Sequence, residues 1–193
     1  MLAEDLKPNR LEAAKDVAAE FINGRPNDNI GITLFAGETF TQCPLTVDHA
    51  VLLDMIHNIK CGLITDGTAV GMGIANAVTR LKDSKAKSKV IILLTDGTNN
   101  KGDISPMTAA EIAKSFGIRV YTIGVGTNGM APYPYPVGNT VQYVSMPVEI
   151  DEKTLTEIAG TTDGNYFRAT SNSKLKEVYE EIDKLEKTKL NVK

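Results

Sequence analysis

Val90-Ile91-Ile92-Leu93-Leu94-Thr95-Asp96-Gly97 is the stretch that decides the fold. Its aliphatic run has no polar alternation, which is typical of a strand buried on both faces in a parallel sheet covered by helices on each side. An Asp-Gly pair directly after such a strand has little reason to be there for packing. We therefore expect a doubly wound α/β fold with Asp96 at the carboxyl end of a strand, where open α/β sheets bind ligands.

The chain on either side of this strand alternates between helical and strand periodicity. Downstream we predict helices over 107–116 and 152–159, strands over 119–125 and 165–168, and a final helix with its apolar face over 175–185 that is capped by Ser171, Asn172 or Ser173. Upstream we predict a helix over 9–22, a hairpin of strands 30–35 and 39–41, and two helices that include 51–59 and 70–81. The order predicts a mainly parallel sheet with helices on both faces and one antiparallel edge.

Residues 127–148 interrupt this order and form a Pro/Tyr-rich insertion. They contain four of the eight prolines of the chain, three of them in Pro132-Tyr133-Pro134-Tyr135-Pro136. We predict a hairpin around Gly138-Asn139 at one sheet edge. Such a segment is either a recognition surface or a rigid surface loop, and the sequence leaves both open.

Composition limits the function classes. The 193 residues fit a single domain over 1–193, and the net charge of -3 comes from interspersed charges without a basic block, so nucleic acid is not an expected partner. No apolar run approaches the ~20 residues that a membrane span needs, so the chain as given is expected to be soluble. Cys43 and Cys61 lie without metal-ligand spacing; we expect buried thiols, with a disulfide as the alternative.

Two polar segments are candidates for a binding site. Asp96 follows a buried strand, and Thr68 stands in the Gly-rich segment Asp66-Gly67-Thr68 at the start of a predicted helix. A carboxylate and a hydroxyl at these places can offer oxygen ligands to a cation. A turn aspartate and a helix cap explain the same residues equally well.

Together these residues resemble a known family. Thr95-Asp96-Gly97 and Gly67-Thr68 are similar to two parts of the metal-ion-dependent adhesion site of von Willebrand factor A (VWA) domains. Longer segments resemble the bacterial Bat aerotolerance family, in particular BatA-like members, over essentially the whole chain: Pro8 to Lys15, Phe40 to Leu45, residues 90–100 and Tyr121 to Tyr133.

The resemblance implies a metal site that is incomplete in this chain. Family members carry Asp-x-Ser-x-Ser after the first, central strand, and its three side chains join a threonine and a second aspartate around Mg²⁺ or Mn²⁺. Met1-Leu2-Ala3-Glu4-Asp5 resembles the stretch just after that motif, so motif and strand are missing from this chain. Thr68 and Asp96 carry over as metal ligands. We expect little or no metal on these two alone, because Mg²⁺ requires about six oxygens.

The resemblance also implies partners and location. A partner's acidic side chain would complete the metal shell, with Glu4, Asp5, Asp66, Asn99 and Asn100 near the rim. The expected partners are proteins, above all sister Bat proteins, and no small-molecule substrate is expected. The parent protein is expected in the bacterial inner membrane with this domain in the periplasm, acting in aerotolerance or in oxidative or envelope stress.

A missing central strand poses a folding problem. Burying the apolar side chains of one strand contributes on the order of 10 kcal/mol, comparable with the net stability of a domain. We expect the gap to be closed by sheet rearrangement, by strand exchange with another chain in an oligomer, or by an upstream segment.

Other functions explain the sequence less well. Gly124-Val125-Gly126-Thr127-Asn128-Gly129 has dinucleotide-binding spacing, but no helix is predicted to begin at its third glycine. A phosphotransfer enzyme using Asp96 as nucleophile lacks the expected second carboxylate and lysine. His49 and His57, eight residues apart, are expected at the surface or the edge of the core. A metal-independent scaffold in a membrane-associated complex is the main alternative to an adhesion module, and neither is an enzyme.

Overall fold

The elements follow one another as the periodicity predicts. The computed structural model describes residues 1–191. Its helices and strands are α1 (Arg10–Asn23), β1 (Ile30–Phe35), β2 (Thr39–Thr46), α2 (His49–His57), α3 (Val70–Leu81), β3 (Lys89–Thr95), α4 (Pro106–Ser115), β4 (Ile118–Val125), β5 (Met130–Val137), β6 (Thr140–Pro147), α5 (Glu152–Thr161), β7 (Tyr166–Ala169) and α6 (Asn172–Asn191).

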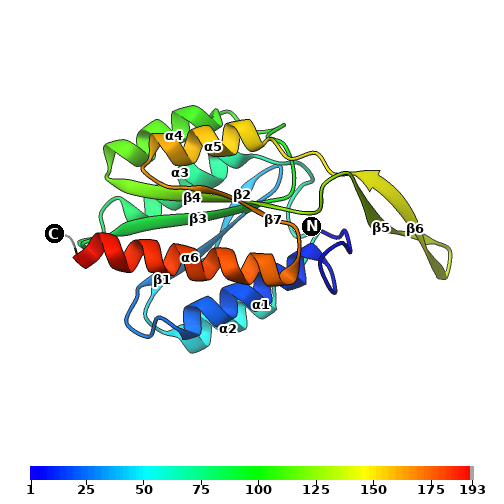
Figure 1. Cartoon of the computed structure of the whole chain (residues 1–193), viewed down its shortest axis with the longest axis horizontal. Helices are drawn as coiled ribbons and strands as arrows, with labels where there is room; N and C mark the ends of the chain where they lie inside the picture. Colours follow the sequence, from blue (N-terminus) through cyan, green and yellow to red (C-terminus); the bar gives the residue numbers. More distant parts are fainter. Residues whose placement is uncertain (192–193) are drawn as a thin grey trace.

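Strands β3, β4 and β7 form a parallel sheet with helices on both faces. β4 lies in the middle and pairs with β3 on one side and with β7 on the other. Helices α1 and α6 cover one face, and α3, α4 and α5 cover the other (Figure 1). β4 contributes alternate residues to the two cores: Val120 packs beneath α3 to α5, whereas Tyr121 and Ile123 pack beneath α1 and α6. The predicted doubly wound α/β architecture is confirmed.

The β1–β2 hairpin is the antiparallel edge of the fold and packs with α2 on a core of its own. Among the described residues β1 is not hydrogen-bonded to β3, so the expected sheet rearrangement that would close the gap does not occur. None of the residues of β1 is fully buried, although Ile30, Ile32, Leu34 and Phe35 have large apolar side chains. Helix α3 packs against β1, β2 and β3 and thus joins the two strand units.

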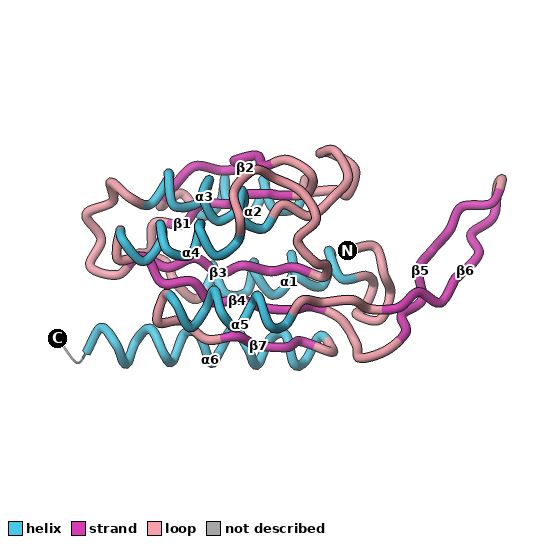
Figure 2. Tube along the Cα trace, turned by 90° about the horizontal axis from the view of Figure 1, so that it is seen from above, coloured by secondary structure: helices cyan, strands magenta, loops and turns pink. Residues whose placement is uncertain are grey.

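Strands β5 and β6 form a long hairpin, here called the arm (Met130–Pro147), which projects from the body of the molecule (Figures 1 and 2). Gly138 has a φ of +57° at the first central position of its two-residue turn, a position that favours glycine in type II′ turns. The hairpin predicted around Gly138-Asn139 is confirmed.

The chain contains two cysteines, Cys43 and Cys61. Both thiols are free; Cys43 is buried as expected, whereas Cys61 is exposed because it lies in the loop after α2, so the prediction of a buried thiol is wrong there. Along residues 1–191 no helix combines the length and the apolar character that a membrane span requires.

Candidate functional site

Asp96 and Thr68 meet at the carboxyl end of the parallel sheet. Asp96 directly follows β3, and Thr68 lies two residues before the start of α3. The two loops are in close contact, because a Cβ placed on Gly97 would lie only 3.2 Å from Thr68 Oγ1. The fold thus brings together the carboxylate and the hydroxyl that the sequence singles out.

Asn99 and Asn100 hold this arrangement in place. The Asn100 side-chain oxygen accepts a hydrogen bond from the Thr68 backbone N–H at 2.9 Å, and the Asn99 side-chain oxygen accepts one from the Val70 N–H at 2.8 Å. The α3 N-cap residue, Ala69, offers no side-chain cap, so Asn99 supplies a cap from another loop. The two asparagines, expected at the rim, therefore use their side-chain oxygens within the molecule.

Cationic groups of the chain contact the Asp96 carboxylate. Its Oδ2 accepts hydrogen bonds from the α-amino group of Met1 and, at 3.2 Å, from Arg10 Nη1. No cluster of three or more His, Cys, Asp or Glu side chains suited to a metal ion occurs in the described part of the chain. One carboxylate beside a guanidinium and one hydroxyl do not by themselves suit a divalent cation, which requires several oxygen ligands.

Arg10 and Asp5 form a buried ion pair next to Asp96. Arg10 Nε and Nη2 each donate to the Asp5 carboxylate at 2.7 Å, and the two side chains are 5% and 3% exposed. The Thr127 N–H also donates to Asp5, at 2.8 Å. Burial alone would raise the pKa of Asp5, but these hydrogen bonds and the Arg10 charge lower it to about 2. Asp5 was expected at the rim, yet its carboxylate is turned inward and already occupied.

The pair also fixes the root of the arm. Gly126 has a φ of +142°, and a Cβ there would lie 2.6 Å from Arg10 Nη2. The close approach of the guanidinium to the backbone after β4 therefore requires glycine. Sequence reasoning missed Arg10, because helix periodicity assigns it to a polar first turn, and it missed this role of Asp5, which was expected at the rim.

The other two rim candidates, Glu4 and Asp66, belong to different segments. Glu4 Oε1 accepts a hydrogen bond from the Tyr143 hydroxyl of the arm at 3.1 Å. Asp66 is exposed and accepts from the Gly67 N–H at 2.9 Å. Glu4 thus connects the N-terminal segment to the arm, and Asp66 belongs to the loop of Thr68.

A cavity of about 590 Å³ connects Asp96 with the arm. Asp96, Arg10 and Met1 line its polar end. The opposite wall is largely apolar and comes from one face of the arm and the residue beyond it: Ala131, Tyr133, Tyr135, Val144, Met146, Pro147 and Val148. Its volume lies within the range of about 300–1,000 Å³ that is usual for ligand pockets.

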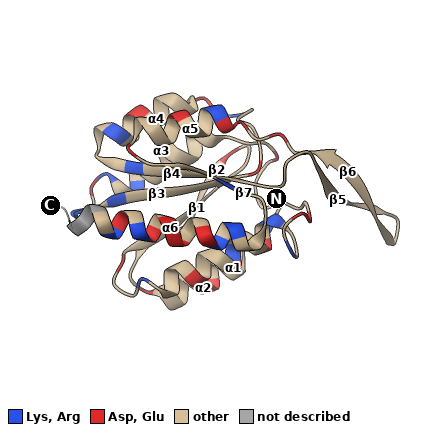
Figure 3. Cartoon of the chain, in the orientation of Figure 1, with Lys and Arg blue, Asp and Glu red and all other residues tan. Residues whose placement is uncertain are grey.

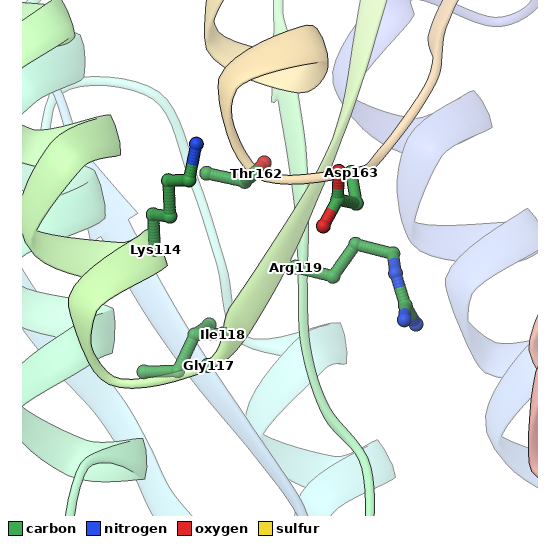
Figure 4. A pocket seen from close by; sticks show the side chains of 6 residues that line it. All are labelled: Lys114, Gly117, Ile118, Arg119, Thr162 and Asp163. Carbon is green, nitrogen blue, oxygen red and sulfur yellow. The ribbon is translucent and has the colours of Figure 1, made fainter. Parts of the chain in front are cut away.

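A second hollow lies at the opposite end of the sheet, where β4 begins (Figure 4). Lys114, Arg119, Thr162 and Asp163 are among its lining residues. Its volume of about 90 Å³ is well below that of ordinary ligand pockets. We therefore place the candidate site at the carboxyl end of the strands alone.

The rival motifs lie in contexts that do not support them. Gly129 is followed by strand β5 and not by a helix, so the dinucleotide-binding interpretation of the glycines fails as expected. His49 Nε2 and His57 Nδ1 contact the backbone oxygens of Asp28 and Leu53 at 2.9 and 2.8 Å. His49 is half-buried and His57 exposed, which confirms the prediction for both.

Comparisons with known proteins identify the family. The model of the von Willebrand factor type A domain matches residues 2–181. BatB from Bacteroides thetaiotaomicron is 34% identical, with a TM-score of 0.82 and coverage of 97% of this chain and 93% of that one. An aerotolerance-related membrane protein from Bacteroides fragilis is 31% identical, also with a TM-score of 0.82, over 95% and 91% of the two chains.

Curated relatives extend further than this chain. A UPF0353 protein from Nocardia farcinica is 31% identical over 95% of the chain but only 58% of its own length. The chain spans little more than half the length of the curated relatives that it matches first. From the match over 2–181 and the two Bacteroides structures, the chain belongs to the von Willebrand factor type A family, with the Bat aerotolerance-related proteins.

Proposed function

We propose that this domain is a non-enzymatic protein–protein interaction module of a membrane-associated bacterial protein that acts in aerotolerance or in oxidative or envelope stress. Its partners are proteins, foremost sister Bat proteins, and the domain lies on the periplasmic side of the inner membrane. The binding face is the carboxyl end of the sheet with Thr68, Asp96 and the rim residues Glu4 and Asp66.

The observation that carries this proposal is the cavity between Asp96 and the arm. One wall is apolar and contains Tyr133, Tyr135 and Met146, residue types that are enriched in protein interfaces. The other end presents Asp96 and the Arg10 guanidinium. An extended peptide segment with an apolar side chain towards the arm and a polar group towards Asp96 matches both ends.

A divalent cation, Mg²⁺ or Mn²⁺, is part of the proposed site in the intact protein. Thr68 and Asp96 would supply two of its oxygen ligands. The remaining ligands would come from an Asp-x-Ser-x-Ser motif and from an acidic side chain of the partner, since about six oxygens are needed. The fold is compatible with such a site, because proximal thread matrix protein 1 from the mussel byssus, 24% identical, has been solved with a zinc-occupied MIDAS motif.

A metal-independent scaffold is the second candidate. It is favoured by the contact of Asp96 with Arg10, whose guanidinium donates to the Asp96 carboxylate at 3.2 Å. In this case the partner binds in the same cavity, but affinity does not depend on a divalent ion.

Calorimetric titration with Mg²⁺ and Mn²⁺ separates the two candidates. The samples are the present chain, a chain with the Asp-x-Ser-x-Ser motif ahead of Met1, and the longer chain with Asp96→Ala. Asp83→Ala is the matched control, because Asp83 is an exposed carboxylate that lies after the far end of α3. We expect binding by the longer chain and by its Asp83→Ala variant only. At a hundredfold excess over Kd, the ion should add about 2.7 kcal/mol to the free energy of unfolding.

Absence of binding in every sample would refute the metal site and leave the scaffold. Equal binding with Asp96→Ala would remove Asp96 from the ligand set.

A further inference from the structure

The arm is an uncharged and exposed hairpin. From Met130 to Pro147 it contains no Asp, Glu, Lys, Arg or His, and Figure 3 shows it without charge along its whole length. Every residue of β6 is exposed. The exposed large apolar side chains of the arm are Met130, Tyr135, Val137, Val141, Tyr143, Val144 and Met146. Because isolated two-stranded hairpins are at best marginally stable in water, this surface calls for a covering partner.

Prolines block the outer edge of β5. Pro132, Pro134 and Pro136 pair with Ser145, Tyr143 and Val141 of β6. Proline has no N–H to donate, so these pairs are the non-hydrogen-bonded ones, whose backbone groups point away from the hairpin.

Two backbone hydrogen bonds agree with this assignment. The Glu4 N–H donates to the Pro132 carbonyl from outside the arm at 2.9 Å. The Val148 N–H donates to the Gly129 carbonyl at 2.8 Å. Gly129 and Val148 are therefore a hydrogen-bonded pair, as expected if such pairs alternate with the proline pairs along the hairpin.

The outer edge of β6 has free backbone groups, because the residues that pair with the prolines point their backbone groups away from β5. Val141, Tyr143 and Ser145 direct their N–H and C=O groups away from β5, and no backbone group of residues 1–191 bonds to them from outside the arm. Both views show the arm projecting from the body (Figures 1 and 2), and the Tyr143 hydroxyl reaches the Glu4 side chain of the N-terminal segment. An open strand edge of this kind is a template for pairing with another strand.

We propose that this edge pairs with its counterpart in a second copy of the chain, β6 against β6, antiparallel about a twofold axis at Tyr143. Val141 of one copy then pairs with Ser145 of the other, and Tyr143 pairs with its equivalent. The arm itself contains no charged residue, and the Glu4 carboxylate near the axis accepts a hydrogen bond from the Tyr143 hydroxyl of its own copy. The resulting four-stranded sheet ends on both sides in a proline-blocked β5, so the assembly stops at two copies.

Apolar side chains accompany the open edge on β6. Val141, Tyr143, Val144 and Met146 are 48–58% exposed. The facing β6 of a second copy would cover part of this surface.

A lipid surface fits the arm less well. The tip consists of Gly138, Asn139 and Thr140, which are polar or lack a side chain. The apolar side chains lie along the shaft, where an open β6 edge in lipid would leave backbone groups without partners.

Sedimentation velocity over a range of concentrations tests the pairing. The double variant Val141→Pro/Ser145→Pro removes two N–H groups from the open edge of β6 and leaves the hydrogen bonds between β5 and β6 intact. The matched control Val141→Ala/Ser145→Ala removes side chains but keeps the N–H groups. We expect dimers for the wild type and the alanine pair, and a dimer dissociation constant at least tenfold higher for the proline pair.

A cysteine cross-link gives a second measurement that does not depend on proline. In a Cys61→Ser background, Tyr143→Cys should form an intermolecular disulfide on oxidation, because paired Cα atoms at the axis lie about 5.5 Å apart. Gln142→Cys is the control, since its equivalent is displaced along the strands and the two cannot bridge.

Three results would overturn the proposal: a wild type that stays monomeric at millimolar concentration, proline and alanine pairs that dimerise equally, or a monomer that co-sediments with anionic vesicles through the arm. The inference does not depend on the Asp96 site, so Asp96→Ala should leave the dimer unchanged.

Discussion

Asp5 and Arg10 join three segments at the residue scale. The pair connects the N-terminal segment to the loop after β3 through Asp96, and to the loop after β4 through Thr127. Arg10 is buried at the start of α1, where a charged residue is stable only with a partner. The pair is therefore structural, although it lies beside the proposed binding face.

Asp5→Asn should lower the free energy of unfolding by about 3 kcal/mol at pH 7, because it leaves the buried guanidinium without its main anion. The pKa of Asp5 in the folded protein, about 2, lies below its unfolded value. Its contribution is therefore fully present above about pH 4 and is lost as the pH falls towards 2. Urea unfolding at pH 7 and at pH 2.5 should show the difference between wild type and variant shrinking at the lower pH.

Asp16→Asn is the control for this experiment, since Asp16 is exposed on the same helix. An Asp5→Asn variant as stable as this control at pH 7 would show that the ion pair has no net structural role.

The candidate site was only partly predictable from residues. Thr68 and Asp96 stand next to glycines at element ends, and this local pattern suffices to select them. Arg10 contacts a residue 86 positions away, and Asn99 acts as a cap for a helix that precedes it in the chain. Contacts of this kind depend on the tertiary structure and have no local signal.

At the scale of elements, α6 is fixed to the sheet by a buried carboxylate. Glu186 accepts hydrogen bonds from the Tyr121 hydroxyl at 2.6 Å, from Ser88 at 2.9 Å and from Arg119 at 2.5 Å. Burial would raise the pKa of Glu186, but these three donors hold it below its usual value. Burial and the nearby carboxylate raise the pKa of Tyr121. The cluster closes the end of the core opposite the candidate site.

Glu186→Gln should destabilise the protein by about 2 kcal/mol, because charge-assisted hydrogen bonds become neutral ones and Arg119 loses its counter-charge. Glu181→Gln, exposed on the same helix, should change stability by less than about 0.5 kcal/mol. Thermal or urea unfolding of both variants measures the difference. Equal stability of the two would mean that the cluster is not an anchor.

Strand boundaries were predicted well for the buried strands of the parallel sheet and poorly for the strands of the hairpins. The aliphatic runs of β3 and β4 coincide with the predicted strands within one or two residues. β2 continues to Thr46, beyond the predicted end at Thr41, and includes Pro44. Because β2 pairs only with β1 within residues 1–191, a missing N–H is tolerated there, as it is in β5. The same tolerance explains why a proline-rich stretch forms a strand.

At the scale of the whole molecule, the strands divide into the three-stranded parallel sheet, the β1–β2 hairpin and the arm. The sequence predicts the fold class, because the alternation of elements is a local property. Among the described residues β1 and β3 do not pair but are joined through α3, and no periodicity in the sequence reports this arrangement.

Hydrogen exchange should reflect this division. Amides of β4, which is paired on both sides, should exchange slowest, and the amides of β1 that face away from β2 should exchange at least a hundredfold faster. Mass spectrometry of peptides from the two strands measures this contrast. Equal protection of β1 and β4 would show that another strand covers the free edge of β1.

Arg10 makes a firm contact with Asp5 and a weaker contact with Asp96. Two of its nitrogens grip Asp5 at 2.7 Å, whereas only one reaches Asp96, at 3.2 Å. Asp96 can therefore change partners while the Arg10 guanidinium keeps its place. A ligand that binds at the carboxyl ends of the strands would replace the single Arg10–Asp96 hydrogen bond and leave the Arg10–Asp5 ion pair intact.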